Sequence, residues 1–185
     1  SYGSILVSEK GSGFVSVEVP SSILRKLGEA SDFIIDSLYA WWACQDPDEC
    51  ARVTHIQIKA DNGPESNGRR TQFLKRMVEF ADHIGKSIRL LYYPPYHSKY
   101  NPVERCWGIL EKHWNGAKLT DTETMLEWAK SMTWKGIHPV VQLNRTAYEK
   151  GVTVAKVAMQ AVESRLARNP LLPKWDILIR PACTV

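Results

Sequence analysis

The sequence lacks the marks of several protein classes. Its four cysteines include no CxxC pair, and no second pair of ligands follows Cys44 and Cys50 at a spacing that suits zinc. No apolar run is long enough to span a bilayer, and the first residues lack the basic and then apolar pattern of a secretory signal. No Ser-His or Cys-His motif of a covalent nucleophile stands out, and there is no internal repeat. We therefore expect a cytosolic protein with reduced thiols and no membrane partner.

The composition is that of an ordinary globular domain. The 185 residues are 44% hydrophobic and 24% charged, which suits one domain with room for an appendage. The net charge of +4 permits a polyanionic partner such as a nucleic acid but does not require one. Because the sequence does not begin with methionine, we expect it to be part of a longer chain.

The stretch 88–114 predicts a strand, a loop and a helix. Its first six residues are mostly aliphatic or aromatic, as in a strand, and two prolines end that strand. The polar loop that follows contains His97 and Lys99, and His97 has the alternative of a hydrogen bond within the loop. The Asn-Pro pair ahead of Glu104 is typical of a helix start, and apolar residues then recur every three or four positions. Glu104 therefore lies in the first turn of a helix.

A second acid, Asp61, follows the strand predicted upstream. Residues 53–60 alternate apolar and polar side chains, as a half-buried strand does, and a cluster of turn residues comes next. Asp61 thus lies at the carboxyl end of a strand, where open α/β sheets usually bind their ligands. Each acid also has an ordinary explanation, because Asp61 suits a turn and the helix dipole favours Glu104. Two acids at the ends of neighbouring predicted elements together favour a functional site.

Helices are predicted on either side of the strand that ends before Asp61. The helix over 31–42 has one apolar face that would cover a sheet, with Asp36 on its surface. The helix over 69–84 begins with Arg69 and Arg70, which could contact phosphates or simply form a solvated face. The remaining predicted elements are a hairpin over 2–19, an extended segment at 138–142, a helix from the Thr120 capping box to Gly136, and a helix over 154–168.

The segments IKADNGPE and YYPPYHSKYNPVERCWGILEKHWNG resemble the catalytic core of DDE transposases. The similarity is greatest to the ISAzo13 (Rhodopirellula-type) insertion-sequence family, a distant relative of the IS630/Tc1-mariner group. It extends from about Ser31 to about Trp175, and its Asn-Pro-x-Glu motif is fairly specific. The resemblance implies that Asp61 is the second catalytic aspartate of the family and Glu104 its terminal glutamate. The first catalytic aspartate has no counterpart here, so we expect the chain to begin after the strand that carries it; the alternative is divergence, with an acid recruited from elsewhere.

The fold that this resemblance implies is α/β and RNase H-like. It is a mixed sheet flanked by helices, here without its first strand and with a C-terminal helical extension. We expect residues 1–115 to form the catalytic core, partial at its N-terminus, and residues 116–185 to form the helical extension packed on it.

The chemistry that the resemblance implies is metal-dependent cleavage and transfer of DNA strands in transposition. Such a reaction uses two Mg²⁺ or Mn²⁺ ions about 3.5–4 Å apart, which activate a water or 3′-hydroxyl and stabilise the leaving oxygen. Carboxylates are preferred ligands of Mg²⁺, and the resemblance makes Asp61 and Glu104 the metal ligands. The candidate DNA contacts are His97, Lys99, Arg69, Arg70 and Arg105. The implied partners are DNA at element ends and at a target, bound by a homo-oligomer in the bacterial cytoplasm and associated with the nucleoid.

Two other functions stay open from the sequence. A metal-dependent nuclease of the same RNase H-like superfamily would hydrolyse DNA without strand transfer. A non-catalytic DNA-binding protein or decayed transposase remnant would cut nothing, and the missing third acid favours this alternative. The two are separated from a transposase by the reaction products and by the effect of replacing Asp61.

Overall fold

The computed structural model describes most of the chain as two compact units. Unit 1 contains Glu29–Pro95 and Tyr148–Val185, and unit 2 contains Tyr2–Gly28 and Tyr96–Ala147. The described residues are 14–16, 31–60, 63, 66–94, 102–133, 136–142, 146, 148–149 and 152–182. Within them, only the backbone is described for residues 14–16, 102–104, 106, 107, 140 and 142. Each unit is considered by itself.

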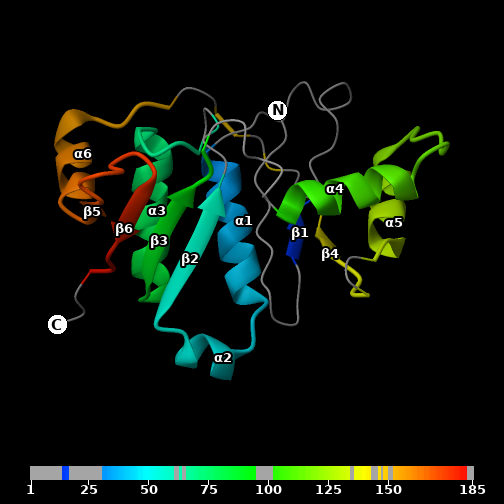
Figure 1. The fold of residues 1–185 in the computed structure, drawn as a ribbon, viewed down its shortest axis with the longest axis horizontal. Helices are drawn as coiled ribbons and strands as arrows, with labels where there is room; N and C mark the ends of the chain where they lie inside the picture. Colours follow the sequence, from blue (N-terminus) through cyan, green and yellow to red (C-terminus); the bar gives the residue numbers. More distant parts are fainter. Residues whose placement is uncertain are drawn as a thin grey trace. The chain divides into compact units, whose positions relative to one another are not determined.

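Unit 1 is built on an open sheet of four strands (Figure 1). Their order across the sheet is β2 (His55–Ala60), β3 (Ser87–Tyr92), β6 (Asp176–Ile179) and β5 (Leu166–Arg168). β2 and β3 are parallel, whereas β6 runs antiparallel to both β3 and β5. The prediction of a mixed α/β sheet is therefore confirmed, and the predicted strands over 53–60 and 88–93 correspond to β2 and β3.

One face of this sheet forms the core of unit 1. The alternation read from the sequence of β2 is a true burial pattern, with Ile56 and Ile58 buried and their neighbours exposed. In register with them across β3 lie Ile88 and Leu90, both fully buried, and Leu90 is opposite Ile177 of β6. Burying each of these side chains contributes about 1.5–3 kcal/mol. The shared face explains why β6 joins this sheet.

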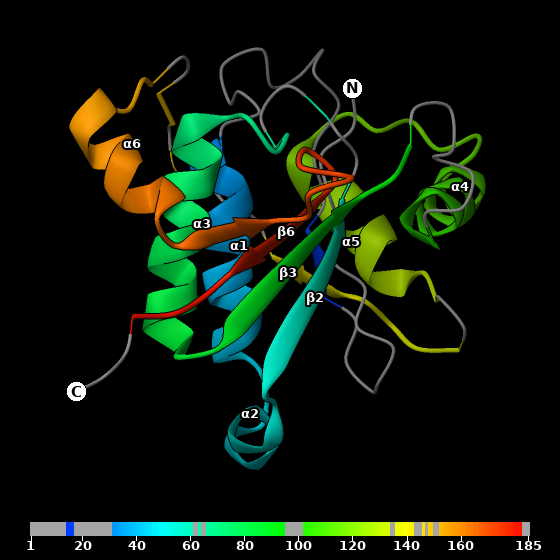
Figure 2. The ribbon, with the colours of Figure 1, turned by 60° about the vertical axis from the view of Figure 1, so that its left-hand side comes forward.

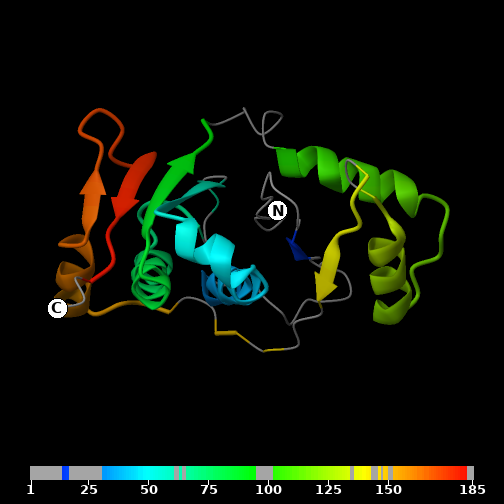
Figure 3. The ribbon, with the colours of Figure 1, turned by 90° about the horizontal axis from the view of Figure 1, so that it is seen from below.

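Three helices cover that buried face (Figures 2 and 3). They are α1 (Ser31–Ala43), α3 (Thr71–Ile84) and α6 (Lys156–Glu163). α3 connects the parallel strands β2 and β3 and buries Leu74, Met77 and Phe80 almost completely. It ends at Gly85, whose φ of 64° lies in the left-handed region that glycine adopts at helix ends. The helices predicted over 31–42 and 69–84 are confirmed.

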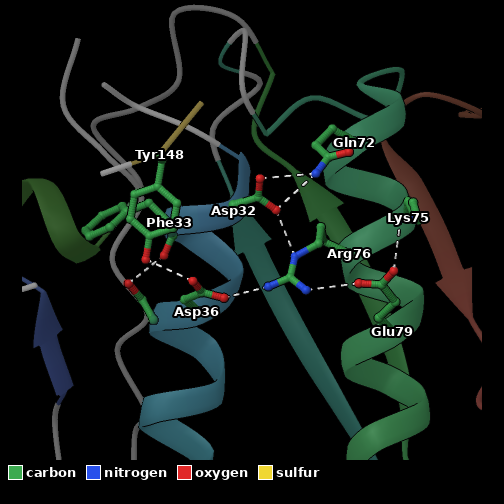
Figure 4. A network of polar contacts seen from close by, with 9 residues as sticks. Asp32, Phe33, Asp36, Gln72, Lys75, Arg76, Glu79 and Tyr148 are labelled. Carbon is green, nitrogen blue, oxygen red and sulfur yellow. Dashed lines mark hydrogen bonds and ion pairs between the residues drawn. The ribbon is translucent and has the colours of Figure 1, made fainter. Parts of the chain in front are cut away.

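A cluster of charges joins α1 to α3 (Figure 4). Arg76 on α3 forms ion pairs with Asp32 and Asp36 on α1, at N–O distances of 2.9 and 2.5 Å, and with Glu79 at 3.0 Å. Burial disfavours the charge of Arg76, but its bonds to these three carboxylates outweigh that effect and raise its pKa. Tyr148 donates a hydrogen bond of 2.9 Å to the second oxygen of Asp36. Asp36, predicted to lie at the surface, thus faces α3.

A short helix that the sequence analysis left out precedes β2. α2 (Pro47–Arg52) begins after Asp46, whose carboxylate accepts hydrogen bonds from the backbone N–H groups of Asp48 and Glu49. An aspartate cap followed by proline at the first position is a strong helix start signal. This start signal lies in the sequence between Cys44 and Cys50, but no helix was predicted from it.

Unit 2 contains α4 (Pro102–His113), α5 (Thr122–Ser131) and a parallel pair of strands, β1 (Phe14–Ser16) and β4 (Val140–Gln142). The predicted extended segment at 138–142 is confirmed by β4. The predicted cap of α5 was wrong by one residue, because Asp121 and not Thr120 accepts the hydrogen bond from Thr124 N–H, at 2.7 Å. A carboxylate is a stronger acceptor than a hydroxyl, which explains the choice.

The predicted C-terminal helical extension needs correction. The helix expected over 154–168 ends at Glu163, and residues 166–168 instead form β5, paired with β6 in a hairpin. The segment after residue 115 therefore supplies strands to the sheet of unit 1 as well as helices. Helical periodicity gave the wrong prediction for residues 166–168. The conformation of so short a strand depends on its pairing with β6 and not on the local sequence pattern. The predicted domain boundary at residue 115 stays a prediction.

Among the described residues, no helix combines the length and the apolar character that crossing a membrane requires.

Replacing Arg76 tests the charge cluster. We expect Arg76→Met to lower the free energy of unfolding by about 1–3 kcal/mol, because Asp32 and Asp36 are left partly buried without a counter-charge. Lys75→Met is the matched control, since Lys75 on the same helix pairs with Glu79, at 3.4 Å, and its side chain is 42% exposed. We expect the control to cost about 0–0.5 kcal/mol in urea unfolding. Equal effects of the two variants would show that the cluster contributes nothing beyond a surface ion pair.

Acid sensitivity tests the attachment of β6 to β3. Hydrogen bonds from Arg89 and Asn169 lower the pKa of Asp176 to about 2, below its ordinary value of 3.8. A carboxyl with a depressed folded-state pKa contributes stability that is present above its unfolded pKa and is lost as pH falls through the folded one. We expect the free energy of unfolding to fall between about pH 4 and pH 2, and to fall less in Asp176→Asn. Parallel acid profiles of the two proteins in urea unfolding would contradict this.

Candidate functional site

The carboxyl end of β2 is the place from which the candidate site is built. β2 ends at Ala60, opposite Tyr92 of the parallel strand β3, and the next residue in the chain is Asp61. The N–H of Tyr93 donates a hydrogen bond of 3.1 Å to the carbonyl of Ala60, so the two strands remain paired up to their ends. Asp61 itself lies outside the described residues. Its position just after a strand of a parallel pair agrees with the chemistry expected at such an edge.

The described residues between β2 and α3 are joined by hydrogen bonds to one another. The carbonyl of Gly63 accepts hydrogen bonds from the N–H of Ser66 at 3.3 Å and from the side-chain amide of Asn67 at 3.2 Å. Arg70 N–H donates to the carbonyl of Asn67 at 3.0 Å, and the helix begins at the next residue. These internal bonds shape the loop as a short series of turns.

Residues outside the loop also hold it. The phenolic O–H of Tyr92 donates a buried hydrogen bond of 2.7 Å to the carbonyl of Ser66. Burial raises the pKa of this phenol well above its ordinary value, so it remains a donor at any physiological pH. Arg168 of β5 donates to the carbonyl of Gly68 at 2.9 Å. The sequence analysis missed both residues, because Tyr92 read as an ordinary strand residue and Arg168 as the end of a helix.

The basic residues predicted to contact DNA are placed unevenly. Arg69 is exposed and precedes α3, whereas Arg70 is half-buried and is the last residue before that helix. Arg105 is exposed on α4, in unit 2. His97 and Lys99 lie outside the described residues. Arg69 and Arg105 are therefore the two predicted contacts whose described side chains are most open to solvent.

Glu104 lies in the first turn of α4, as the Asn-Pro pair predicted, and its side chain is outside the description. Asp61 belongs to unit 1 and Glu104 to unit 2, so the meeting of the two carboxylates stays a prediction. Among the described residues, no three His, Cys, Asp or Glu side chains form a cluster that could hold a metal ion. The proposed donors are hard carboxylate oxygens, which is the ligand type that Mg²⁺ and Mn²⁺ prefer.

Several described acids of unit 1 are engaged in structural contacts. Asp32 and Asp36 bind Arg76, Asp82 binds Arg165, Glu163 binds Arg168 and Asp176 binds Arg89. Each of these carboxylates has a cationic partner within hydrogen-bond distance, which opposes its recruitment by a metal ion. A third metal ligand is therefore not expected from this group.

The strand, the loop and the charge next to Asp61 indicate which chemistry the site can perform. An acid that follows a buried strand has a defined starting point along the chain, and the loop after it is held by three internal and two external contacts to its backbone. The exposed Arg69 in that loop provides positive charge where a phosphate backbone could approach. Such a setting favours metal-assisted phosphoryl chemistry over covalent catalysis, which fits the lack of a nucleophile motif in the sequence.

The comparisons with known proteins agree with this setting. The family model described as the Rhodopirellula transposase DDE domain matches residues 1–181. No curated protein and no solved structure matches the chain. DDE transposase domains generally use divalent metal ions and act on DNA. Because the match covers almost the whole length, the chain belongs to the Rhodopirellula transposase DDE domain family.

Proposed function

We propose that this chain supplies Asp61 and Glu104 to a metal-dependent centre that cleaves and transfers DNA strands in transposition. The single observation that carries the proposal is the family match over residues 1–181, which contains both acids in their strand-end and Asn-Pro-x-Glu motifs. Two structural facts support it. β2 ends immediately before Asp61, and Glu104 lies in the first turn of α4. We also propose that the fold is RNase H-like, since the mixed sheet with its parallel pair β2 and β3 is compatible with that fold.

The role of each acid is derived from phosphoryl-transfer chemistry. Two bound Mg²⁺ or Mn²⁺ ions would activate a water or a 3′-hydroxyl and neutralise the leaving oxygen. Asp61 would hold metal from the end of a rigid strand, and Glu104 would do so from the first turn of a helix. The third acid expected of the family is not assigned to any residue of this chain. No side chain forms a covalent bond to the substrate in this scheme.

The proposed substrate contacts are electrostatic. Arg69 and Arg105, with Arg70, His97 and Lys99, would bind phosphates of the element end or of the target. A transposase that joins two DNA sites needs more than one copy of its centre, so we propose a homo-oligomer assembled on DNA in the bacterial cytoplasm, associated with the nucleoid. Phosphate contacts of this kind weaken with added salt, and each arginine that is lost lowers the salt dependence of binding.

Replacing the two acids tests the assignment. In the complete gene product with Mg²⁺ or Mn²⁺, we expect Asp61→Asn and Glu104→Gln each to reduce cleavage of element-end DNA by about 100-fold or more, because a metal ligand is worth several kcal/mol in the transition state. Matched controls are Asp48→Asn on α2 and Glu111→Gln on α4, both exposed acids. We expect these controls to cleave like the parent protein.

Four outcomes of the same assay test the site and decide between the functions. Cleavage with joining of the 3′-end to a target plasmid supports a transposase, whereas cleavage without joining supports a hydrolytic nuclease. Asp61→Asn that cleaves as well as the parent would contradict the site. A parent protein that binds DNA but does not cut it under any divalent metal would leave only the non-catalytic function.

A further inference from the structure

We propose that the C-terminal hairpin formed by β5 and β6 is a positioning element for the loop that carries Asp61. Arg168 and Tyr92 hold the backbone of this loop, and Gly68 lets the turn of the hairpin approach it. The inference rests on the proposed function, in which Asp61 binds metal. It goes further because it assigns a task to a C-terminal segment about 100 residues away from the acid along the chain.

The hairpin and the loop are joined through the main chain of the loop. Arg168 of β5 donates to the carbonyl of Gly68 at 2.9 Å, across 100 positions of sequence. Tyr92 donates to the carbonyl of Ser66 at 2.7 Å. Both contacts are made to backbone oxygens, so they fix the path of the loop whatever its side chains are. They act on the segment between Asp61 and the start of α3.

Arg168 is well suited to this task because its guanidinium is itself fixed. Its Nε and Nη2 donate to the two carboxylate oxygens of Glu163, at 3.2 and 2.7 Å. Its Nη1 is shared between the carbonyls of Gly68 and Pro173, the latter at 3.1 Å. A planar fork with all three nitrogens engaged loses little freedom when it binds the loop. The contact thereby ties the loop to β5, to the turn of the hairpin and to the end of α6.

Gly68 is the point of closest approach. A Cβ atom at this position would lie 2.6 Å from the carbonyl oxygen of Lys174 and 2.9 Å from the Cδ1 atom of Ile177. The first distance is to backbone, which cannot move without shifting the hairpin. The hairpin turn therefore packs directly against the loop, and only glycine permits this packing.

The hairpin is in turn held to the strands that frame the site. The N–H of Tyr92 donates to the carbonyl of Trp175 at 2.9 Å, next to the place where the side chain of Tyr92 reaches the loop. Asp176 binds Arg89 of β3 through two hydrogen bonds of 2.9 and 2.8 Å. The hairpin, β3 and the loop thus share one residue, Tyr92, as their common contact.

Hydrogen bonds hold the backbone both before and after Asp61 along the chain. Before it, the carbonyl of Ala60 accepts a hydrogen bond from Tyr93 N–H. After it, the carbonyl of Gly63 is bound by Ser66 and Asn67. Tyr92 holds Ser66, and Arg168 of the hairpin holds Gly68, the residue after Asn67. A metal ligand must be held within about 0.5 Å of its productive position, and a misplacement of about 1 Å costs on the order of 100-fold in rate.

Two conservative pairs of variants test the inference. Tyr92→Phe removes the bond to Ser66 and keeps the ring, and Tyr148→Phe is its control, since it removes a similar bond to Asp36 elsewhere. Arg168→Met removes the bond to Gly68, and Arg165→Met is its control, since Arg165 binds Asp82 and the carbonyl of Arg180 but no loop residue. The control variants therefore lose comparable contacts within unit 1 without touching the loop.

The expected results are specific to the loop. In the complete protein, hydrogen–deuterium exchange of the amides of residues 63–70 should become about 5- to 10-fold faster in Tyr92→Phe and Arg168→Met, and unchanged in both controls. Binding of Mn²⁺ alone, followed by its electron paramagnetic resonance signal, should weaken by about 10-fold or more in the first two variants only. The concentration of Mg²⁺ that gives half-maximal cleavage should rise by a similar factor.

The outcomes separate this inference from the proposed function. If Asp61→Asn abolishes Mn²⁺ binding while Tyr92→Phe and Arg168→Met bind Mn²⁺ like their controls, the proposed function stands and the positioning role is overturned. If Asp61→Asn binds Mn²⁺ like the parent, the proposed function fails whatever the loop variants do. Faster exchange in residues 63–70 together with weaker Mn²⁺ binding supports the positioning role.

Discussion

β3 is hydrogen-bonded along both of its edges, and the rest of unit 1 depends on that double pairing. β2 lies parallel to it on one side and β6 antiparallel on the other. Ile88 and Leu90 are fully buried on the face that the helices cover, so β3 cannot slip in register without exposing both. Because its register is fixed, its last residue has a single position. From there Tyr92 reaches the loop after β2 with its side chain and the hairpin turn with its backbone.

Of the basic residues in and just before α3, some pair with carboxylates and one is open to solvent. Arg76 faces the carboxylates of α1 and is only about one quarter exposed, so it serves the packing of the two helices. Lys75 pairs with Glu79 in the manner of an ordinary surface ion pair. Arg69, just before the helix, is exposed and lies on the loop that follows Asp61. Of the two arginines of unit 1 that were predicted to contact phosphates, Arg69 is therefore the one open to solvent, and Arg70 is half-buried.

Local signals predicted those parts of the fold whose conformation is decided locally. The alternation in β2 and the helical pattern of α3 each act over a few residues, and the predictions of this strand and this helix are confirmed. The strand before Asp61 and the helix turn that contains Glu104 were predictable for the same reason. The meeting of these acids is a non-local matter that no pattern within a single element could decide. The α2 cap shows the reverse case, in which a clear local signal was present but was passed over.

The hairpin could not be predicted, and the physical cause is the separation of its partners. β5 has three residues and β6 has four, too few for a periodic pattern to distinguish a strand from a frayed helix. The conformation of β6 is decided by pairing with β3, almost 90 positions earlier, where Arg89 is opposite Leu178 and Leu90 opposite Ile177, and β5 pairs in turn with β6. Gly68 illustrates the same dependence on distant partners. In the sequence it is one more turn glycine, and in the structure it is the residue that lets a distant segment touch the loop after Asp61. A family motif therefore identifies the acids proposed for the site. The residues that hold the loop after Asp61 are found only from contacts between segments that lie far apart in the sequence.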